Sequence, residues 1–186
     1  MDLTGKLLIA MPGMGDLRFE RSVILMCSHD DDGAMGLIIN KPAEDVHLSD
    51  LLAQLEIEGR KDAAGRDLPV HFGGPVEGAR GFLLHSNDYE SPLQTLRISD
   101  TLRMTATLDI LEDIASGTGP SKFLMVLGYA GWGPGQLEQE IAHNGWLTAE
   151  VNEQIIYDLD NDAKWGAALA EIGVDPLTLS ASSGNA

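Results

Sequence analysis

Short apolar runs separated by turn-forming residues predict a chain rich in β-strands. Residues 21–29 (RSVILMCSH) are apolar at both the odd and the even positions of a strand. Because both faces are apolar, we predict that this strand is central in its sheet or part of a barrel. Further strands are expected at residues 7–11, 36–40, 70–72, 81–85, 96–99, 102–106, 122–127, 146–151 and 154–157.

Apolar residues at helical spacing predict three or four helices between these strands, at residues 48–55, 108–117, 136–144 and 161–173. The strands occur in hairpin-like clusters and not in regular βαβ alternation, which is typical of the α+β class. The chain contains no internal repeat and no linker between domains. We therefore predict a single domain over residues 1–175, with an exposed loop at 56–67 and a flexible C-terminal tail at 176–186.

Charge restricts the classes of partner. The chain carries 29 acidic and 12 basic residues, which gives a formal net charge of −17. Lys and Arg supply most of the affinity for nucleic-acid phosphates, so direct DNA or RNA binding is disfavoured. The same charge balance disfavours anionic membrane surfaces.

The N-terminal sequence and the single cysteine favour the cytoplasm. The apolar run at 7–11 is too short for a signal peptide, and no apolar stretch approaches the roughly 18 residues of a membrane helix. Cys27 is the only cysteine, so an internal disulfide is excluded. We therefore expect a cytoplasmic protein.

No catalytic or metal-binding set is recognisable. Cys27 and His29 lie two positions apart on a predicted strand, so their side chains leave the same face. Their Cβ atoms would be about 7 Å apart, which is too far for a catalytic dyad. The acidic run 30–32 lacks the ligand pattern of an EF-hand, and a solvated turn is favoured. The five histidines show no metal-ligand spacing. We predict no catalytic residue, no metal and no cofactor.

A glycine-rich segment, GYAGWGPG at 128–135, follows a predicted strand and precedes a predicted helix. Its spacing matches neither the Rossmann fingerprint nor the P-loop. Glu138 and Glu140 also place negative charge at the start of the helix, which repels an anion. A structural loop is favoured over a ligand loop. For Trp132 a buried position is favoured, and contact with a pocket or partner is the alternative.

Three loops rich in Gly and Pro, at residues 11–18, 73–81 and 128–136, carry aromatic and polar side chains. The charged residues of the first loop form either a surface ion-pair network or the polar rim of a pocket. We predict that the three loops converge on one concave surface that contacts a ligand or partner. The candidate residues are Asp16, Arg18, Phe19, Arg21, Asn40, Gly73, Gly74, Pro75, Trp132 and Gln136.

Several long segments resemble the AlgH/YqgE family of bacterial proteins: LLIAMPGMGDLRFERSVI, GAMGLIINKP, HFGGPVEGARGFLLH and LGYAGWGPGQLEQEIAHNGWL. The similarity extends from about residue 3 to 173. It implies an α+β fold with a bifurcated, mostly antiparallel sheet that forms a pseudo-barrel, with three to four helices packed on it. It also implies bacterial cytoplasm but no established catalytic mechanism. Some members carry the label of transcriptional regulator, which the acidic charge limits to indirect regulation.

These observations favour a non-catalytic binding or regulatory module whose partner is a protein or a small molecule. One alternative is an enzyme that acts on a small molecule in a pocket formed by the glycine-rich loops. Its catalytic groups would come from Arg18, Glu20, His29, Asn40 and His85. A further alternative, direct DNA binding, conflicts with the charge. The oligomeric state is not predicted.

Overall fold

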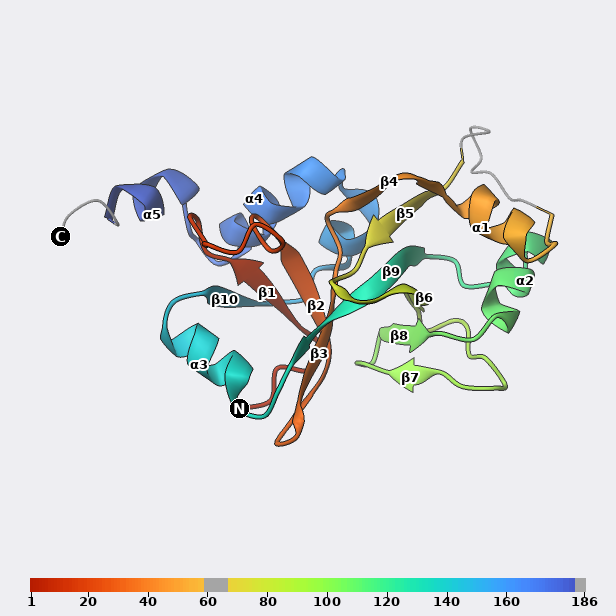
Figure 1. The fold of residues 1–186 in the computed structure, drawn as a ribbon, viewed down its shortest axis with the longest axis horizontal. Coiled ribbons are helices and arrows are strands. Elements are labelled where there is room, and N and C mark those ends of the chain that lie inside the picture. The colour runs from red at the N-terminus through yellow and green to blue at the C-terminus, as the bar shows by residue number, and fades with distance from the viewer. Residues whose placement is uncertain (59–66, 183–186) are drawn as a thin grey trace.

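The computed structural model describes residues 1–58 and 67–182. A curled, mostly antiparallel sheet forms a half-barrel, and helices pack around it (Figure 1). The strands are β1 (Lys6–Ala10), β2 (Val23–Asp30), β3 (Gly33–Ile38), β4 (Pro42–His47), β5 (Pro69–Phe72), β6 (Val76–Ser86), β7 (Leu96–Arg97), β8 (Leu102–Thr105), β9 (Phe123–Trp132) and β10 (Trp146–Glu150). The helices are α1 (Leu48–Gln54), α2 (Asp109–Ser116), α3 (Gln136–Ala142), the π-helical turn η1 (Gln154–Asp158), α4 (Asn161–Glu171) and α5 (Pro176–Ser182).

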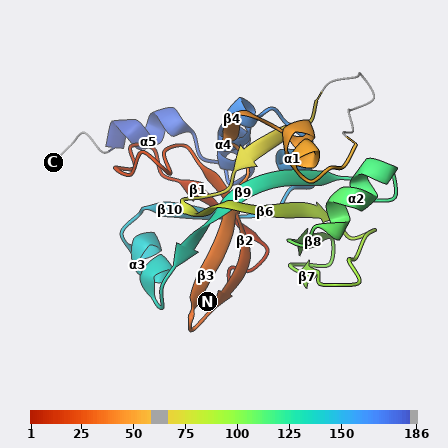
Figure 2. The ribbon, with the colours of Figure 1, turned by 45° about the vertical axis from the view of Figure 1, so that its right-hand side comes forward.

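The sheet divides at β9. The strand order along the main path is β10-β1-β2-β3-β9-β6-β8-β7, and β5 pairs with β9 as a branch that continues to β4. Residues 130–132 of β9 pair with β3, whereas residues 125–127 pair in parallel with β5. Figure 2 shows the β2–β3 hairpin and the β6–β8 strands diverging from this point. The predicted α+β class and bifurcated sheet are confirmed.

The apolar pattern of β2 determines how the core is layered. Val23, Leu25 and Cys27 belong to the cluster that α4 covers with Trp165 and Leu169. The residues that alternate with them, including Ile24 and Met26, belong to a second cluster that α3 covers with Leu137. A third cluster lies between the sheet and helices α1 and α2. The central position predicted for this strand is correct, because β2 pairs with both β1 and β3.

The strand expected at 154–157 is wrong, because Gln154–Asp158 form the π-helical turn η1. Two consecutive residues, Ile155 and Ile156, are both buried, whereas successive residues of a strand point to opposite faces. The side chain of Asn152 accepts a hydrogen bond from the Gln154 N–H at 3.0 Å, just before the turn. Lys164, which is buried, donates to the Ile156 carbonyl at 2.9 Å.

Two further expectations differ from the structure. Residues 76–80 and 128–132, expected in loops, extend β6 and β9. Residues 176–182, expected in a flexible tail, form α5, so the described residues contain five α-helices and η1, more than the three to four predicted. Most of the loop expected at 56–67, and the end of the tail, lie outside the described residues. Within the described residues, no helix combines the length and apolar character needed to cross a membrane.

Candidate functional site

The three glycine-rich segments meet at one depression of about 540 Å³, which we call the loop hollow. Six of the predicted surface residues line it: Asp16, Arg18, Phe19, Pro75, Trp132 and Gln136. They come from the loop after β1, the residue before β6, the end of β9 and the start of α3. The structure therefore brings together side chains that are more than a hundred residues apart in the sequence.

Aromatic rings form one wall of the loop hollow. Trp146, at the start of β10, packs edge-to-face on Trp132 with 6.1 Å between ring centroids and on Phe19 with 5.7 Å. Trp132 is 7% exposed and Trp146 is 3% exposed, so the buried position favoured for Trp132 is correct. Both indoles nevertheless line the hollow.

Glu140 of α3 holds the two indole rings in place. One of its carboxylate oxygens accepts hydrogen bonds from the indole N–H of Trp132 at 2.9 Å and of Trp146 at 2.8 Å. The other oxygen accepts from the Gln136 amide at 3.1 Å. All three donors are neutral, and Glu140 forms no ion pair with a described residue. The hollow therefore contains a carboxylate whose charge no cation balances.

The first loop is fixed by an internal ion pair. The Arg18 guanidinium donates to both carboxylate oxygens of Asp16, at 3.1 and 2.8 Å. This side-chain hydrogen bond lowers the pKa of the Asp16 carboxyl. The guanidinium also lies over the Phe19 ring, 5.6 Å from its centroid. Arg18 is thus neutralised by its neighbour and contributes little positive charge to the hollow.

Arg21 and Asn40 do not line the loop hollow but support the loop beside it. The Arg21 guanidinium lies over the Trp165 ring, 5.0 Å from its centroid. The Asn40 side chain accepts from the Val23 N–H at 2.9 Å and donates to the Arg21 carbonyl at 2.8 Å. Their role in the structure is to join the first loop to the end of β3 and to α4.

Gly73 and Gly74 do not line the hollow but lie where the chain passes against β9. A Cβ atom at Gly74 would lie 2.1 Å from the Tyr129 carbonyl carbon, and one at Gly73 would lie 2.3 Å from the Gly128 carbonyl oxygen. Gly128 itself has φ +72°, a conformation that other residues seldom adopt. The glycines are therefore explained by backbone contact and not by a ligand.

Cys27 and His29 do not share a face, contrary to the expectation from their spacing. A β-bulge between Met26 and Ser28 shifts the alternation of β2. Cys27 remains in the first core cluster, where burial raises the pKa of its thiol to about 12. His29 Nδ1 accepts from the Leu3 N–H at 3.1 Å, so its Nε2–H donates to Glu138 at 2.7 Å.

The remaining catalytic candidates are also engaged elsewhere. His85 Nδ1–H donates to the Ser86 carbonyl, and Nε2 lies 2.8 Å from the Thr105 hydroxyl. Burial lowers the pKa of His85. Of the candidates Arg18, Glu20, His29, Asn40 and His85, only Arg18 lines the loop hollow. Among the described residues, no group of three or more His, Cys, Asp or Glu side chains could hold a metal ion.

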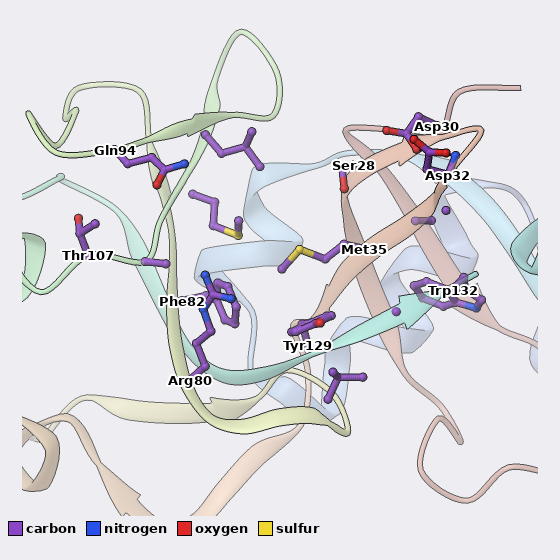
Figure 3. Close-up of a pocket in the computed structure, with 17 residues that line it drawn as sticks. Ser28, Asp30, Asp32, Met35, Arg80, Phe82, Gln94, Thr107, Tyr129 and Trp132 are labelled. Atoms are coloured by element: carbon purple, nitrogen blue, oxygen red, sulfur yellow. The ribbon is translucent and has the colours of Figure 1, made fainter. Parts of the chain in front are cut away.

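A second depression, of about 710 Å³, lies on the concave side of the half-barrel, and we call it the trough (Figure 3). The β2–β3 hairpin forms one wall and β6 and β8 the other, with β9 between them. Val76, Gly131 and Trp132 line both the trough and the loop hollow. The two depressions are therefore adjacent.

Most of the trough could not be recognised from the sequence, because residues 76–80 and 128–132 were expected in loops. As strands, these segments place Arg80 and Phe82 on one face of β6, and Tyr129 and Gly131 on one face of β9. The signal in the sequence was the spacing of two positions within each pair, which is the period of a β-strand. Asp32, interpreted as part of a solvated turn, also lines the trough.

Comparison with known proteins gives the family. The family model described as AlgH-like matches residues 7–177. The chain belongs to this family. A UPF0301 protein of Ruegeria pomeroyi is 63% identical over 100% of both chains, and one of Cereibacter sphaeroides is 55% identical over 100% of both. The resemblance identified from the sequence motifs is therefore confirmed.

Solved structures support the fold. The solution structure of the AlgH protein from Pseudomonas aeruginosa has a TM-score of 0.79 and 40% identity, and the match covers 100% of this chain and 97% of that chain. A crystal structure of a protein from Corynebacterium diphtheriae has a TM-score of 0.73 and 21% identity, with 96% and 91% of the chains covered. The second similarity concerns the fold alone.

Proposed function

We propose that this protein is a non-catalytic binding module of the bacterial cytoplasm with a regulatory role, and that its partner contacts the loop hollow. The observation that supports this most directly is the meeting of three sequence-distant segments around one depression of about 540 Å³. Concave sites of this size, with apolar walls and a few polar groups, are typical of ligand binding.

The charges at the hollow favour a partner with a positively charged group. Glu140 accepts only neutral donors, and Arg18 is paired with Asp16. Aromatic rings beside an unbalanced carboxylate suit an ammonium or guanidinium group. The net charge of −17 adds a long-range attraction for such a partner and repels nucleic acid. We therefore infer a basic protein segment or a small cation, and regulation that does not involve direct DNA contact.

The alternative of an enzyme has no comparable support. Glu20, His29, Asn40 and His85 line neither the loop hollow nor the trough. The side chains of His29, Asn40 and His85 are committed to hydrogen bonds with neighbouring elements. A general acid or base must reach the atom on which it acts. These side chains line neither depression, so neither would bring them to a substrate.

Intrinsic tryptophan fluorescence tests the proposal, because two of the three tryptophans line the hollow. The protein is titrated with lysine-rich peptide, alkylamines, acidic peptide and duplex DNA at physiological salt. We expect a saturable change with the cationic probes that Phe19→Ala weakens about ten-fold. Leu17→Ala is the matched control, since Leu17 is 78% exposed in the same loop.

Tighter binding of DNA or acidic peptide than of the cations would contradict the charge argument. Equal weakening by Phe19→Ala and Leu17→Ala would show that the cations bind the acidic surface without using the hollow.

A further inference from the structure

The trough has the properties of a second, separate binding site. Its volume of about 710 Å³ lies within the range of small-molecule pockets. Met35 of β3, Phe82 of β6, Met104 of β8 and Tyr129 of β9 give the trough an apolar lining. Figure 3 shows Met35, Phe82 and Tyr129 at its centre. Val76 and Leu96, 36% and 39% exposed, add apolar surface at the rim. An apolar group placed here would be removed from water by several strands at once.

Opposite charges stand at the two ends of the trough. Asp30 and Asp32, at the tip of the β2–β3 hairpin, line one end, and Arg80 of β6 lines the other (Figure 3). The Arg80 guanidinium is held over the Phe82 ring, 5.0 Å from its centroid. Among the described residues its ion pair is with Glu77, at 3.3 Å, and most of its five N–H donors have no other partner there. A ligand that satisfies both ends carries a cation at one end and an anion at the other.

The strand register gives the separation of these ends. The hairpin tip lies beside Trp132, because a Cβ at Gly33 would be 2.4 Å from the Trp132 carbonyl oxygen. At the other end, Gly81, next to Arg80, pairs with Leu127. Trp132 and Leu127 are five positions apart on β9, or at most about 16 Å at roughly 3.3 Å per residue, because Gly128 between them is not extended. Since side chains reach inward from both ends, the ligand must span about 10 Å, the length of roughly three extended amino-acid residues.

Polar groups between the two ends are free to pair with a peptide backbone. Within the described part of the chain, the Ser28 hydroxyl, the Gln94 amide and the Tyr129 hydroxyl have no hydrogen-bond partner. Together they offer donors and acceptors along the trough. Such groups match the alternating N–H and C=O groups of an extended chain, whereas an apolar side chain would lie on Met35 and Phe82.

We propose that the trough binds a short zwitterionic peptide of about three residues with an apolar central side chain. The amino terminus lies at Asp30 and Asp32, and the carboxylate lies at Arg80. This site is distinct from the loop hollow, although Val76, Gly131 and Trp132 line both.

Methyl NMR of ¹³C-labelled methionine separates the two sites. Met35 and Met104 line the trough, whereas Met14 lines the loop hollow. The probe is the tripeptide Ala-Phe-Ala with free termini. We expect saturable shifts of the Met35 and Met104 signals without a shift of Met14. Acetylation of the amino terminus and amidation of the carboxyl terminus should each weaken binding about ten-fold, because each removes a charge-assisted contact.

Variants assign each end of the peptide. The double variant Asp30→Asn/Asp32→Asn should abolish the difference between the free and acetylated peptides. Arg80→Ala should abolish the difference between the free and amidated peptides. Asp31→Asn and Arg97→Ala are matched controls, because both residues are exposed and neither lines the trough. The proposal is overturned if the free tripeptide leaves Met35 and Met104 unshifted, if blocked and free peptides bind equally, or if the controls act like the trough variants.

Discussion

Glu140 is the residue on which the geometry of the loop hollow depends. It lies on α3, yet it accepts hydrogen bonds from an indole at the end of β9 and from another at the start of β10. A single carboxylate thus links three elements. Because all of its donors are neutral, its charge stays available to a ligand, and the same contacts that fix the aromatic wall also set the electrostatics of the hollow.

Glu140→Gln should destabilise the protein by about 1–3 kcal/mol. An amide has one acceptor and one donor end, so in either orientation an N–H group faces the indole donors or the Gln136 amide. The free energy of unfolding in urea, followed by circular dichroism, measures the effect. Glu112→Gln, at an exposed position of α2, is the control and should stay within about 0.5 kcal/mol of the parent. An equal effect of the two changes would mean that Glu140 does not hold the indoles.

At the scale of elements, the sequence was informative where the pattern is local. The two apolar faces of residues 21–29 follow from a period of two, and β2 is central as expected. The extent of β9 could not be predicted in this way. Glycines usually mark turns, but in β9 Gly128 is required because the segment at Gly73 and Gly74 passes against it, a contact that depends on residues over fifty positions away.

Gly74→Ala tests this contact. The new Cβ would lie 2.1 Å from a backbone atom of Tyr129, so either β9 or the connection between β5 and β6 must shift. We expect a loss of at least about 3 kcal/mol in the free energy of unfolding, measured in urea. Gly78→Ala is the matched control, because a Cβ at Gly78 meets nothing within 4 Å. If Gly74→Ala were as mild as the control, the close passage against β9 would be wrong.

At the scale of the molecule, the loop hollow and the trough both arise from the bifurcation of the sheet. Both depressions are bounded by β9, where the branches separate, and the residues around them range from Met14 to Trp146. The sequence identified the loop hollow because its glycine-rich segments are conspicuous. It could not identify the trough, since Asp32, Arg80 and Gln94 are unremarkable until six strands bring them together.

The same connectivity makes the stability of the whole fold sensitive to acid through His71. This side chain is 2% exposed in β5, with Nδ1 3.2 Å from the Met125 carbonyl of β9 and Nε2 3.2 Å from the Asn161 side chain at the start of α4. Burial, with a smaller contribution from the charge of Lys164, lowers the pKa of His71 to about 4 from 6.5. The imidazole is therefore neutral in the native state at neutral pH.

Because the unfolded chain binds this proton more readily, the contribution of neutral His71 to the free energy of unfolding is fully present above pH 6.5. This contribution is lost as the pH decreases towards 4. The shift corresponds to a loss of about 3 kcal/mol over this window. His71→Gln, which cannot titrate, should flatten the profile of unfolding free energy between these pH values. Measurement of the same variant at pH 8 isolates the cost of the lost contacts. An unchanged slope in His71→Gln would mean that the acid sensitivity arises elsewhere, and that the link between β5, β9 and α4 does not depend on a neutral histidine.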